Sequence, residues 1–211
     1  MIYLSYYNFK SNLPNERFSD LLMELPVFMQ NKINSFRNRK DAERSLMGNI
    51  ILVRLLAYAG LTSYSLNQVR YTEYNKPFFD DSISYNISHS GDYVVCTLSK
   101  VHEVGIDVEE IRDIPMDDFT GLFSRVEWDE VLSSESKLQA FYTLWTKKEA
   151  FLKAIGCGLN QPLNEVVIEN NTIIWKNKQW FLHEITLDKN HLAWLCCSNS
   201  SPVFSIIDIS V

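Results

Sequence analysis

The chain has 211 residues, a length that favours one domain or two closely packed halves and allows a core large enough to fold without disulfides or a structural metal. Its 46% hydrophobic content, with only 7 glycines and 6 prolines, excludes disordered, fibrous and low-complexity classes. A net charge of −6 argues against a protein that binds nucleic acid through its overall charge.

The N-terminal segment, residues 2–7, predicts a strand and lacks the basic region and apolar run of a signal peptide. The most apolar window, residues 50–60, contains Arg54 and is shorter than the ~20 residues of a membrane span. No zinc-type spacing relates the four cysteines, Cys96, Cys157, Cys196 and Cys197. We therefore predict a protein of the reducing cytoplasm that does not bind a membrane.

A long amphipathic helix is expected over residues 41–59. Gly60 stands where a C-terminal cap belongs, and apolar residues recur at helical spacing, namely Leu46, Ile50, Val53 and Ala57. Residues 83–86 and 93–98 then predict two strands, with residues 88–92 turning between them.

The second half begins with a predicted strand over residues 104–108, followed by a polar, helix-prone loop and a helix over about residues 138–154. Further strands are predicted near Val166, Ile173, Phe181, Ala193 and Phe204. No linker rich in Ser, Gly or Pro separates the halves, so we predict one compact α+β unit.

Two acids alternate with apolar residues in the strand that begins at residue 104. Because side chains alternate across a strand, Asp107 and Glu109 share one face and the apolar side chains share the other. Two carboxylates about 6–7 Å apart repel each other unless a cation lies between them, and oxygen ligands of this kind suit Mg²⁺. The alternative is a half-exposed strand whose acids face solvent.

The predicted helix at residues 138–154 carries a second charged pair. Glu149 and Lys153 are four residues apart, so they lie one above the other on one helix face. An apolar stripe can hold this helix against a sheet, and its members are Phe141, Leu144, Trp145, Leu152 and Ile155. The pair is either an ordinary surface ion pair or, beside a metal, a third carboxylate and a cationic acid.

Residues 86–91 gather small hydroxyl side chains, a histidine and a glycine in one predicted turn. This turn could donate to a phosphate, or it could be a hairpin turn whose side chains bond their own backbone. Upstream cations add to the first interpretation, and they are Lys32, Arg37, Arg39, Lys40, Arg44 and Lys76. The guanidinium of Arg44, on the long helix, could meet a phosphate with two hydrogen bonds.

These motifs occur in one order along the chain: Lys76-Pro77, Asn86-x-Ser88-His89-Ser90, Gly105-Ile106-Asp107-x-Glu109 and Trp145-Thr146-x-Lys148-Glu149-Ala150-x-x-Lys153. Together they resemble the signature of the 4′-phosphopantetheinyl transferases. Two flanking segments are also similar to family motifs, namely Asp41-Ala42-x-Arg44-Ser45-Leu46-x-Gly48 and Phe123-Ser124-x-x-Glu127. The resemblance covers residues 32–159.

Because Asp107 lies in mid-chain, the sequence is similar to the Sfp-type branch of this family rather than to its small trimeric members. The resemblance implies an α+β fold of two similar α/β subdomains, related by pseudo-twofold symmetry, with the active site at their junction. It further implies a monomer. The expected subdomains are residues 1–103, which would bind coenzyme A phosphates, and residues 104–211, which would carry the metal and catalytic residues.

The resemblance also implies the reaction: the 4′-phosphopantetheine arm of coenzyme A moves to a carrier-protein serine and 3′,5′-ADP is released. Mg²⁺, or Mn²⁺ in its place, would be held by Asp107, Glu109 and Glu149. The catalytic residues would be Glu149 as the base for the serine proton and Lys153 as a donor to the diphosphate. Coenzyme A would be bound by Lys32, Arg44, Lys76, Ser88 and His89.

The implied partner is an apo acyl or peptidyl carrier protein of fatty-acid, polyketide or nonribosomal-peptide synthesis. Because this chain is itself acidic, we expect docking through a local patch over residues 116–131, whose apolar side chains include Phe119, Leu122, Phe123 and Trp128. Two alternatives are a non-catalytic module that binds coenzyme A or carriers, and another Mg²⁺ enzyme such as a phosphatase or nuclease.

Overall fold

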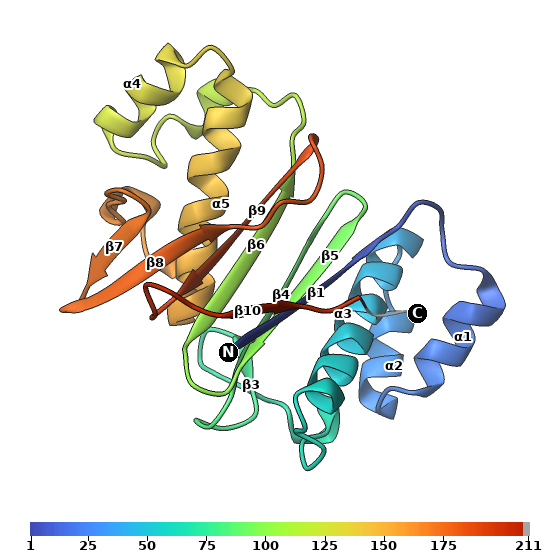
Figure 1. Ribbon diagram of the computed structural model, residues 1–211. Coiled ribbons are helices and arrows are strands. Elements are labelled where there is room, and N and C mark those ends of the chain that lie inside the picture. Colours follow the sequence, from blue (N-terminus) through green and yellow to red (C-terminus); the bar gives the residue numbers. More distant parts are fainter. Residues whose placement is uncertain (209–211) are drawn as a thin grey trace.

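The computed structural model describes residues 1–208, apart from the side chain of Leu159. Two four-stranded sheets lie side by side, and each is covered by a long helix (Figure 1). The first sheet has the order β10-β1-β5-β4, with bounds Phe204–Ile206, Ile2–Asn8, Tyr93–Ser99 and Ser84–Ser90. The second has the order β6-β9-β8-β7, with bounds Val104–Glu110, His191–Cys197, Lys178–Glu184 and Thr172–Trp175.

Helix α3 (Arg39–Tyr58) covers the first sheet. The Asn38 side chain caps its first turn by accepting from the backbone N–H of Lys40 at 2.9 Å, and Gly60 follows its end at φ 68°. Helices α1 (Asn15–Met23) and α2 (Val27–Asn34) lie on the outer side of α3 (Figure 1). The predicted long helix is therefore confirmed, and it begins two residues earlier than expected.

Helix α5 (Lys137–Ile155) covers the second sheet, chiefly strands β6 and β9, and Gly156 ends it at φ 75°. Helix α4 (Arg125–Ser133) packs on α5. Each half thus pairs a four-stranded sheet with one long helix, and the predicted fold class of two similar α/β subdomains is confirmed. The smaller elements are β2 (Arg70–Tyr71), β3 (Pro77–Phe78) and 3₁₀ turns at Leu66–Gln68, Met116–Phe119, Gly158–Asn160 and Leu163–Glu165.

The two sheets meet where β4 and β6 run parallel, and side chains of β4 take the place of a backbone ladder there. Every second β4 side chain accepts a hydrogen bond from a backbone N–H of β6. Ser84 accepts from Val104 at 3.1 Å, Asn86 from Ile106 at 3.0 Å, Ser88 from Val108 at 3.3 Å and Ser90 from Glu110 at 3.1 Å. We call this row of contacts the β4–β6 seam.

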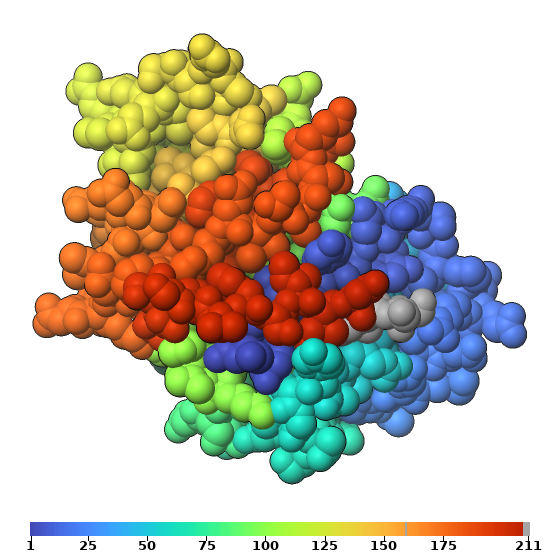
Figure 2. All heavy atoms as spheres, viewed as in Figure 1, coloured from blue at the N-terminus to red at the C-terminus, as the bar shows by residue number. Residues whose placement is uncertain are grey.

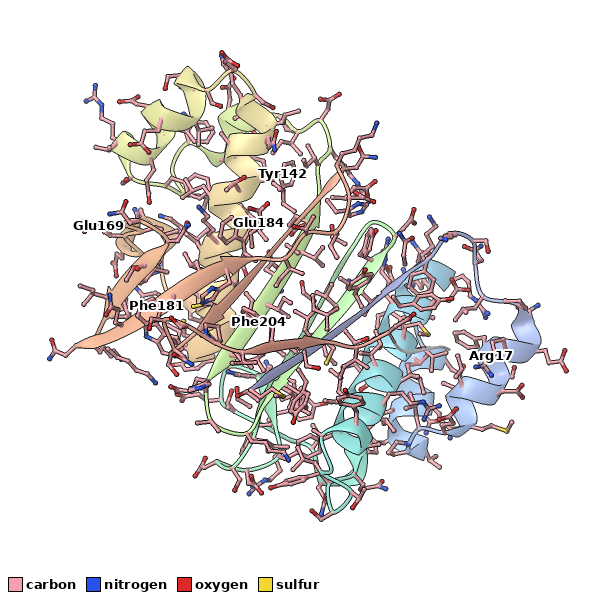
Figure 3. All side chains as sticks on the ribbon, in the orientation of Figure 1. Arg17, Tyr142, Glu169, Phe181, Glu184 and Phe204 are labelled. Carbon is pink, nitrogen blue, oxygen red and sulfur yellow. The ribbon has the colours of Figure 1, made fainter. Side chains whose placement is uncertain are left out.

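The end of the chain crosses back to the first sheet. Strand β10 pairs in parallel with β1, so that Ile2 lies opposite Phe204, and Figure 2 shows this red segment lying across the blue N-terminal strand. The ring of Phe204 (labelled in Figure 3) packs edge-on against His183 of the second sheet, with ring centroids 5.5 Å apart. Within residues 1–208, every helix is too short or too polar to cross a bilayer.

Two expectations about local structure are wrong. Residues 88–92 do not form one turn: β4 continues to Ser90, and Gly91 at φ 56° lets the chain reverse over two residues. Val166 follows a 3₁₀ turn and is not in a strand. The helix-prone segment after β6 contains α4, and α1 and α2 were not predicted, because short apolar faces suffice when a neighbouring helix covers them.

Candidate active site

Helix α5 lies directly on β6 because both carry small residues where they cross. A Cβ atom on Gly105 would lie 2.2 Å from the carbonyl oxygen of Ala150 and 2.3 Å from the backbone nitrogen of Ala154. Residues 105–109 of β6 extend about 13 Å, which is the length of about nine helical residues. Helix α5 therefore runs beside β6 over this whole segment. The acids of β6 therefore face the charged face of α5, as the alternation in the sequence predicts.

Asp107 is the buried centre of this arrangement, with 3% of its surface exposed. Its Oδ1 atom accepts from the Lys153 ammonium at 2.5 Å and from the Ser88 hydroxyl at 2.9 Å. Lys153 also donates to Ser88 at 2.8 Å. One ammonium and one hydroxyl from different halves of the chain thus fix the position of this carboxylate.

Glu109 and Glu149 complete an acidic cluster around Asp107. Burial and the charge of Asp107 raise the pKa of Glu109, although a hydrogen bond from Ser90 at 2.7 Å opposes the increase. The same two causes raise the pKa of Glu149 from 4.5 to about 7, while Lys153 opposes them. Asp107 therefore lies near enough to both glutamates for its charge to disfavour their ionisation.

The carboxylate oxygens of this cluster fit the coordination of a divalent cation. Within residues 1–208, no hydrogen-bond donor reaches the buried Asp107 Oδ2 or Glu149 Oε1 atom. No three His, Cys, Asp or Glu side chains in that part of the chain enclose an ion as they stand. Mg²⁺ does not require such a cage, because one or two carboxylates with substrate phosphates and water suffice. Two buried oxygen atoms without donors, beside a third acid, meet that requirement.

Arg44 and His89 lie at the end of β4 that carries Ser88 and Ser90, on the side of the strand that faces α3. Arg44 of α3 donates to the carbonyl oxygen of Gly91 at 2.6 and 3.0 Å and to Asp41 at 3.0 Å. His89 points to the α3 side of β4, in the opposite direction from Ser88 and Ser90. Although His89 is exposed at one edge, partial burial and then the charges of Arg44 and Lys153 lower its pKa.

Comparison with known proteins identifies the family of this chain. The family model "4′-phosphopantetheinyl transferase superfamily" matches residues 103–199, and the model "4′-phosphopantetheinyl transferase, N-terminal" matches residues 14–100. The 4′-phosphopantetheinyl transferase gsp of Aneurinibacillus migulanus is 33% identical over 184 residues, which cover 85% of this chain and 77% of the relative. This chain belongs to the 4′-phosphopantetheinyl transferase superfamily.

Its membership is of the Sfp type. The 4′-phosphopantetheinyl transferase Sfp of Bacillus subtilis strain 168 is 32% identical over 158 residues, which cover 71% of this chain and 67% of Sfp. The matched regions include strands β4 and β5 of the first sheet and all four strands of the second sheet. The protein is accordingly an enzyme, a 4′-phosphopantetheinyl transferase, and the resemblance inferred from the motifs is confirmed.

In this transferase two of the predicted coenzyme A ligands lie apart from the acidic cluster. The Lys76 ammonium donates to the carbonyl oxygen of Ala154 at 2.7 Å, near the end of α5, and burial lowers its pKa to about 8. Lys32 is exposed in the last turn of α2, on the outer side of α3. The structure thus brings Arg44, Ser88 and His89 toward the acids and places Lys76 and Lys32 farther away.

The transferase also differs from expectation around Glu127. Its carboxylate pairs with Lys148 and accepts from the backbone N–H of Ser124, so it stabilises the start of α4. Phe123 and Trp128 are buried at 4% and 8% exposure, whereas Leu122 and Val126 are exposed. The expectation of an aromatic surface patch is therefore wrong for Phe123 and Trp128, because they form the core between α4 and α5.

The sequence analysis did not predict that the polar side chains of β4 form the β4–β6 seam. The signal was present, since Ser84, Asn86, Ser88 and Ser90 alternate with other residues at the period of a strand. A polar face on an otherwise apolar strand indicates that this face meets polar groups of the protein when solvent is excluded. Here it meets the backbone and carboxylates of β6.

Proposed function

We propose that this transferase moves the 4′-phosphopantetheine arm of coenzyme A to a serine of an apo acyl or peptidyl carrier protein and releases 3′,5′-ADP. The reaction would use Mg²⁺, or Mn²⁺ in its place. The observation that carries the proposal is the pair of buried carboxylate oxygens without donors, Asp107 Oδ2 and Glu149 Oε1, in a cluster that also contains an ammonium group. The identity of the transferred group is inferred from the family to which the chain belongs.

The chemistry requires one proton acceptor and stabilisation of negative charge. The serine Oγ forms a bond to the phosphorus of the arm, the bond from that phosphorus to the bridging oxygen breaks, and 3′,5′-ADP leaves with that oxygen. Glu149 would take the serine proton, because a carboxylate kept ionised by a neighbouring cation can accept a proton from a hydroxyl group. Lys153 lies 2.5 Å from Asp107 and supplies positive charge toward the leaving phosphate.

Asp107, Glu109 and Glu149 would hold the metal. When bound, a divalent cation would neutralise the negative charge of the diphosphate oxygens and so favour cleavage of the bond from phosphorus to the bridging oxygen. Ser88 and Lys153 fix one oxygen of Asp107 and leave the other oxygen available. The protein therefore orients this ligand before substrate binds, which lowers the ordering needed during the reaction.

The first half of the chain would bind the coenzyme A phosphates. We assign the 3′-phosphate to His89 and Arg44, with Lys32 as an outer cation, because His89 and Arg44 lie together at the exposed end of β4. Ser88 and Lys76 already donate within the protein, to Asp107 and Ala154. Lys76 would bind substrate by exchanging its partner, and Ser88 would turn its proton from Asp107 to a phosphate while Lys153 keeps Asp107 in place.

The carrier protein would dock beside α4 and α5. Leu122 and Val126 are exposed at 37% and 68%, so they can contact the apolar face of a small helical domain. We infer that the enzyme works as a monomer in the cytoplasm, on carriers of fatty-acid, polyketide or nonribosomal-peptide synthesis. It would need neither a nucleic acid nor a membrane.

Intact-mass measurement of an apo carrier protein tests the proposal. The carrier is incubated with the enzyme, coenzyme A and Mg²⁺, and a parallel sample contains a chelator. We expect the carrier to gain the mass of one phosphopantetheine arm only with Mg²⁺, and 3′,5′-ADP to form in equal amount. Coenzyme A binding without transfer to any of the three carrier types would favour the non-catalytic module instead.

A further inference from the structure

One hydroxyl group of the β4–β6 seam contacts both the backbone and a carboxylate of the acidic cluster. The Ser90 Oγ atom accepts from the backbone N–H of Glu110 at 3.1 Å and donates to Glu109 Oε2 at 2.7 Å. Ser84 makes the same backbone contact at the other end of the seam, to Val104 at 3.1 Å. Among residues 1–208, the Ser84 hydroxyl has no carboxylate partner.

We propose that Ser90 is a positioning residue that orients Glu109 for the divalent cation, an inference that rests on the proposed function. A glutamate side chain has several rotatable bonds, and the Ser90 hydroxyl holds one of its two oxygens. The other oxygen is then directed by the planar carboxylate geometry rather than by free rotation. Loss of a group that holds a metal ligand in this way typically weakens metal binding about 10–100-fold.

The position of Ser90 also connects the two halves of the site. His89, which we assign to the 3′-phosphate, lies between Ser88 and Ser90 on the same strand. Ser88 donates to Asp107 at 2.9 Å and Ser90 donates to Glu109 at 2.7 Å, two residues apart on each strand. Strand β4 therefore sets the two carboxylates of β6 and the histidine in one fixed relation.

Ser84 provides a matched control for the test. Ser84→Ala and Ser90→Ala each remove one half-buried hydroxyl that accepts from a β6 backbone N–H at 3.1 Å. Only Ser90→Ala also removes a contact to a carboxylate. Ser90→Thr keeps the hydroxyl and shows whether that group, rather than the size of the side chain, matters.

The measurement is Mn²⁺ binding by electron paramagnetic resonance of the free ion, with coenzyme A present, together with the Mg²⁺ dependence of transfer. We expect Ser90→Ala to raise the Mn²⁺ Kd roughly tenfold, Ser84→Ala to leave it near the wild-type value, and Ser90→Thr to restore it. Equal effects of the two alanine variants, or none from Ser90→Ala, would overturn the inference alone. A wild-type protein that transfers the arm but binds no Mn²⁺ would overturn this inference, and one that transfers nothing would overturn the proposed function.

Discussion

The ammonium group of Lys148 is fully buried and lies 2.7 Å from the carboxylate of Glu127. It also donates to the carbonyl oxygen of Leu163 at 2.8 Å. These contacts tie the start of α4 and the segment after α5 to the middle of α5, one residue before Glu149. This buried ion pair therefore holds together the segments around Glu149, the proposed base.

We predict that Lys148→Met lowers the free energy of unfolding by about 3 kcal/mol, because Glu127 is left partly buried without its partner. Urea unfolding measures the effect. The matched control is Asp129→Asn, which breaks the exposed Arg125–Asp129 pair of 3.8 Å and should change stability by less than about 0.5 kcal/mol. Equal effects from the two substitutions would show that the buried pair contributes no more to the free energy of unfolding than the exposed pair.

Gly105→Ala should destabilise the protein by about 3 kcal/mol and lower transfer activity, because the new Cβ would force α5 away from β6. Gly121→Ala is the control, since a Cβ there has no atom within 4 Å. Urea unfolding with a transfer assay measures both effects. If Gly105→Ala matched the control, the close helix–strand contact would not position the acids.

The raised pKa of Glu149 predicts a pH-dependent stability in the enzyme without metal and substrate. A carboxyl group that binds its proton more tightly when folded contributes stability below pH 4.5 and loses it as the pH rises through about 7. For a partly buried group we expect a loss of about 1–2 kcal/mol, which Glu149→Gln should abolish. Urea unfolding from pH 5 to pH 8 in the presence of a chelator measures it, with Glu130→Gln on the surface of α4 as control. A wild-type curve that Glu149→Gln leaves unchanged would contradict the prediction.

His89→Ala should raise the KM for coenzyme A about tenfold, the size of one lost charge-assisted hydrogen bond. Dephospho-coenzyme A, which lacks the 3′-phosphate, should be affected much less. His183→Ala on β8 serves as the control, because His183 packs on Phe204 in the other sheet. Equal losses with both substrates would show that His89 does not bind the 3′-phosphate.

Replacing Leu122 and Val126 by serine should raise the KM for the carrier protein about tenfold while the KM for coenzyme A stays constant. Both side chains are exposed, Leu122 just before α4 and Val126 in its first turn, so their removal should leave the fold intact. Ile174→Ser, on the outer strand β7 with 75% exposure, tests whether any exposed apolar residue has this effect. Unchanged carrier kinetics in the double variant would place docking elsewhere.

The face of β6 was predictable because strand alternation is local. Asp107 and Glu109 follow a strict period of two, and the helical spacing of Glu149 and Lys153 puts both on one face of α5. The closeness of strand and helix was not predictable from either segment alone. It depends on the small residue Gly105 and on which helix covers it, and both are tertiary facts.

The β4–β6 seam was harder to predict for the same reason. A Ser-rich strand next to Gly91 is typical of a turn, and only the partner strand shows that its hydroxyls accept from β6. Helix α4 had a legible signal, since Ser124 and Glu127 have the spacing of a capping box. Strand β10 was predicted near Phe204, but its pairing with β1 was not, because that pairing joins segments far apart in the sequence.

The most direct test of the acidic cluster is a crystal structure of the enzyme with coenzyme A and Mn²⁺, in which anomalous scattering locates the ion. We predict one Mn²⁺ ion in contact with the carboxylates of Asp107, Glu109 and Glu149 and with the diphosphate of coenzyme A. An ion bound elsewhere, or a diphosphate bound far from these three carboxylates, would contradict the account.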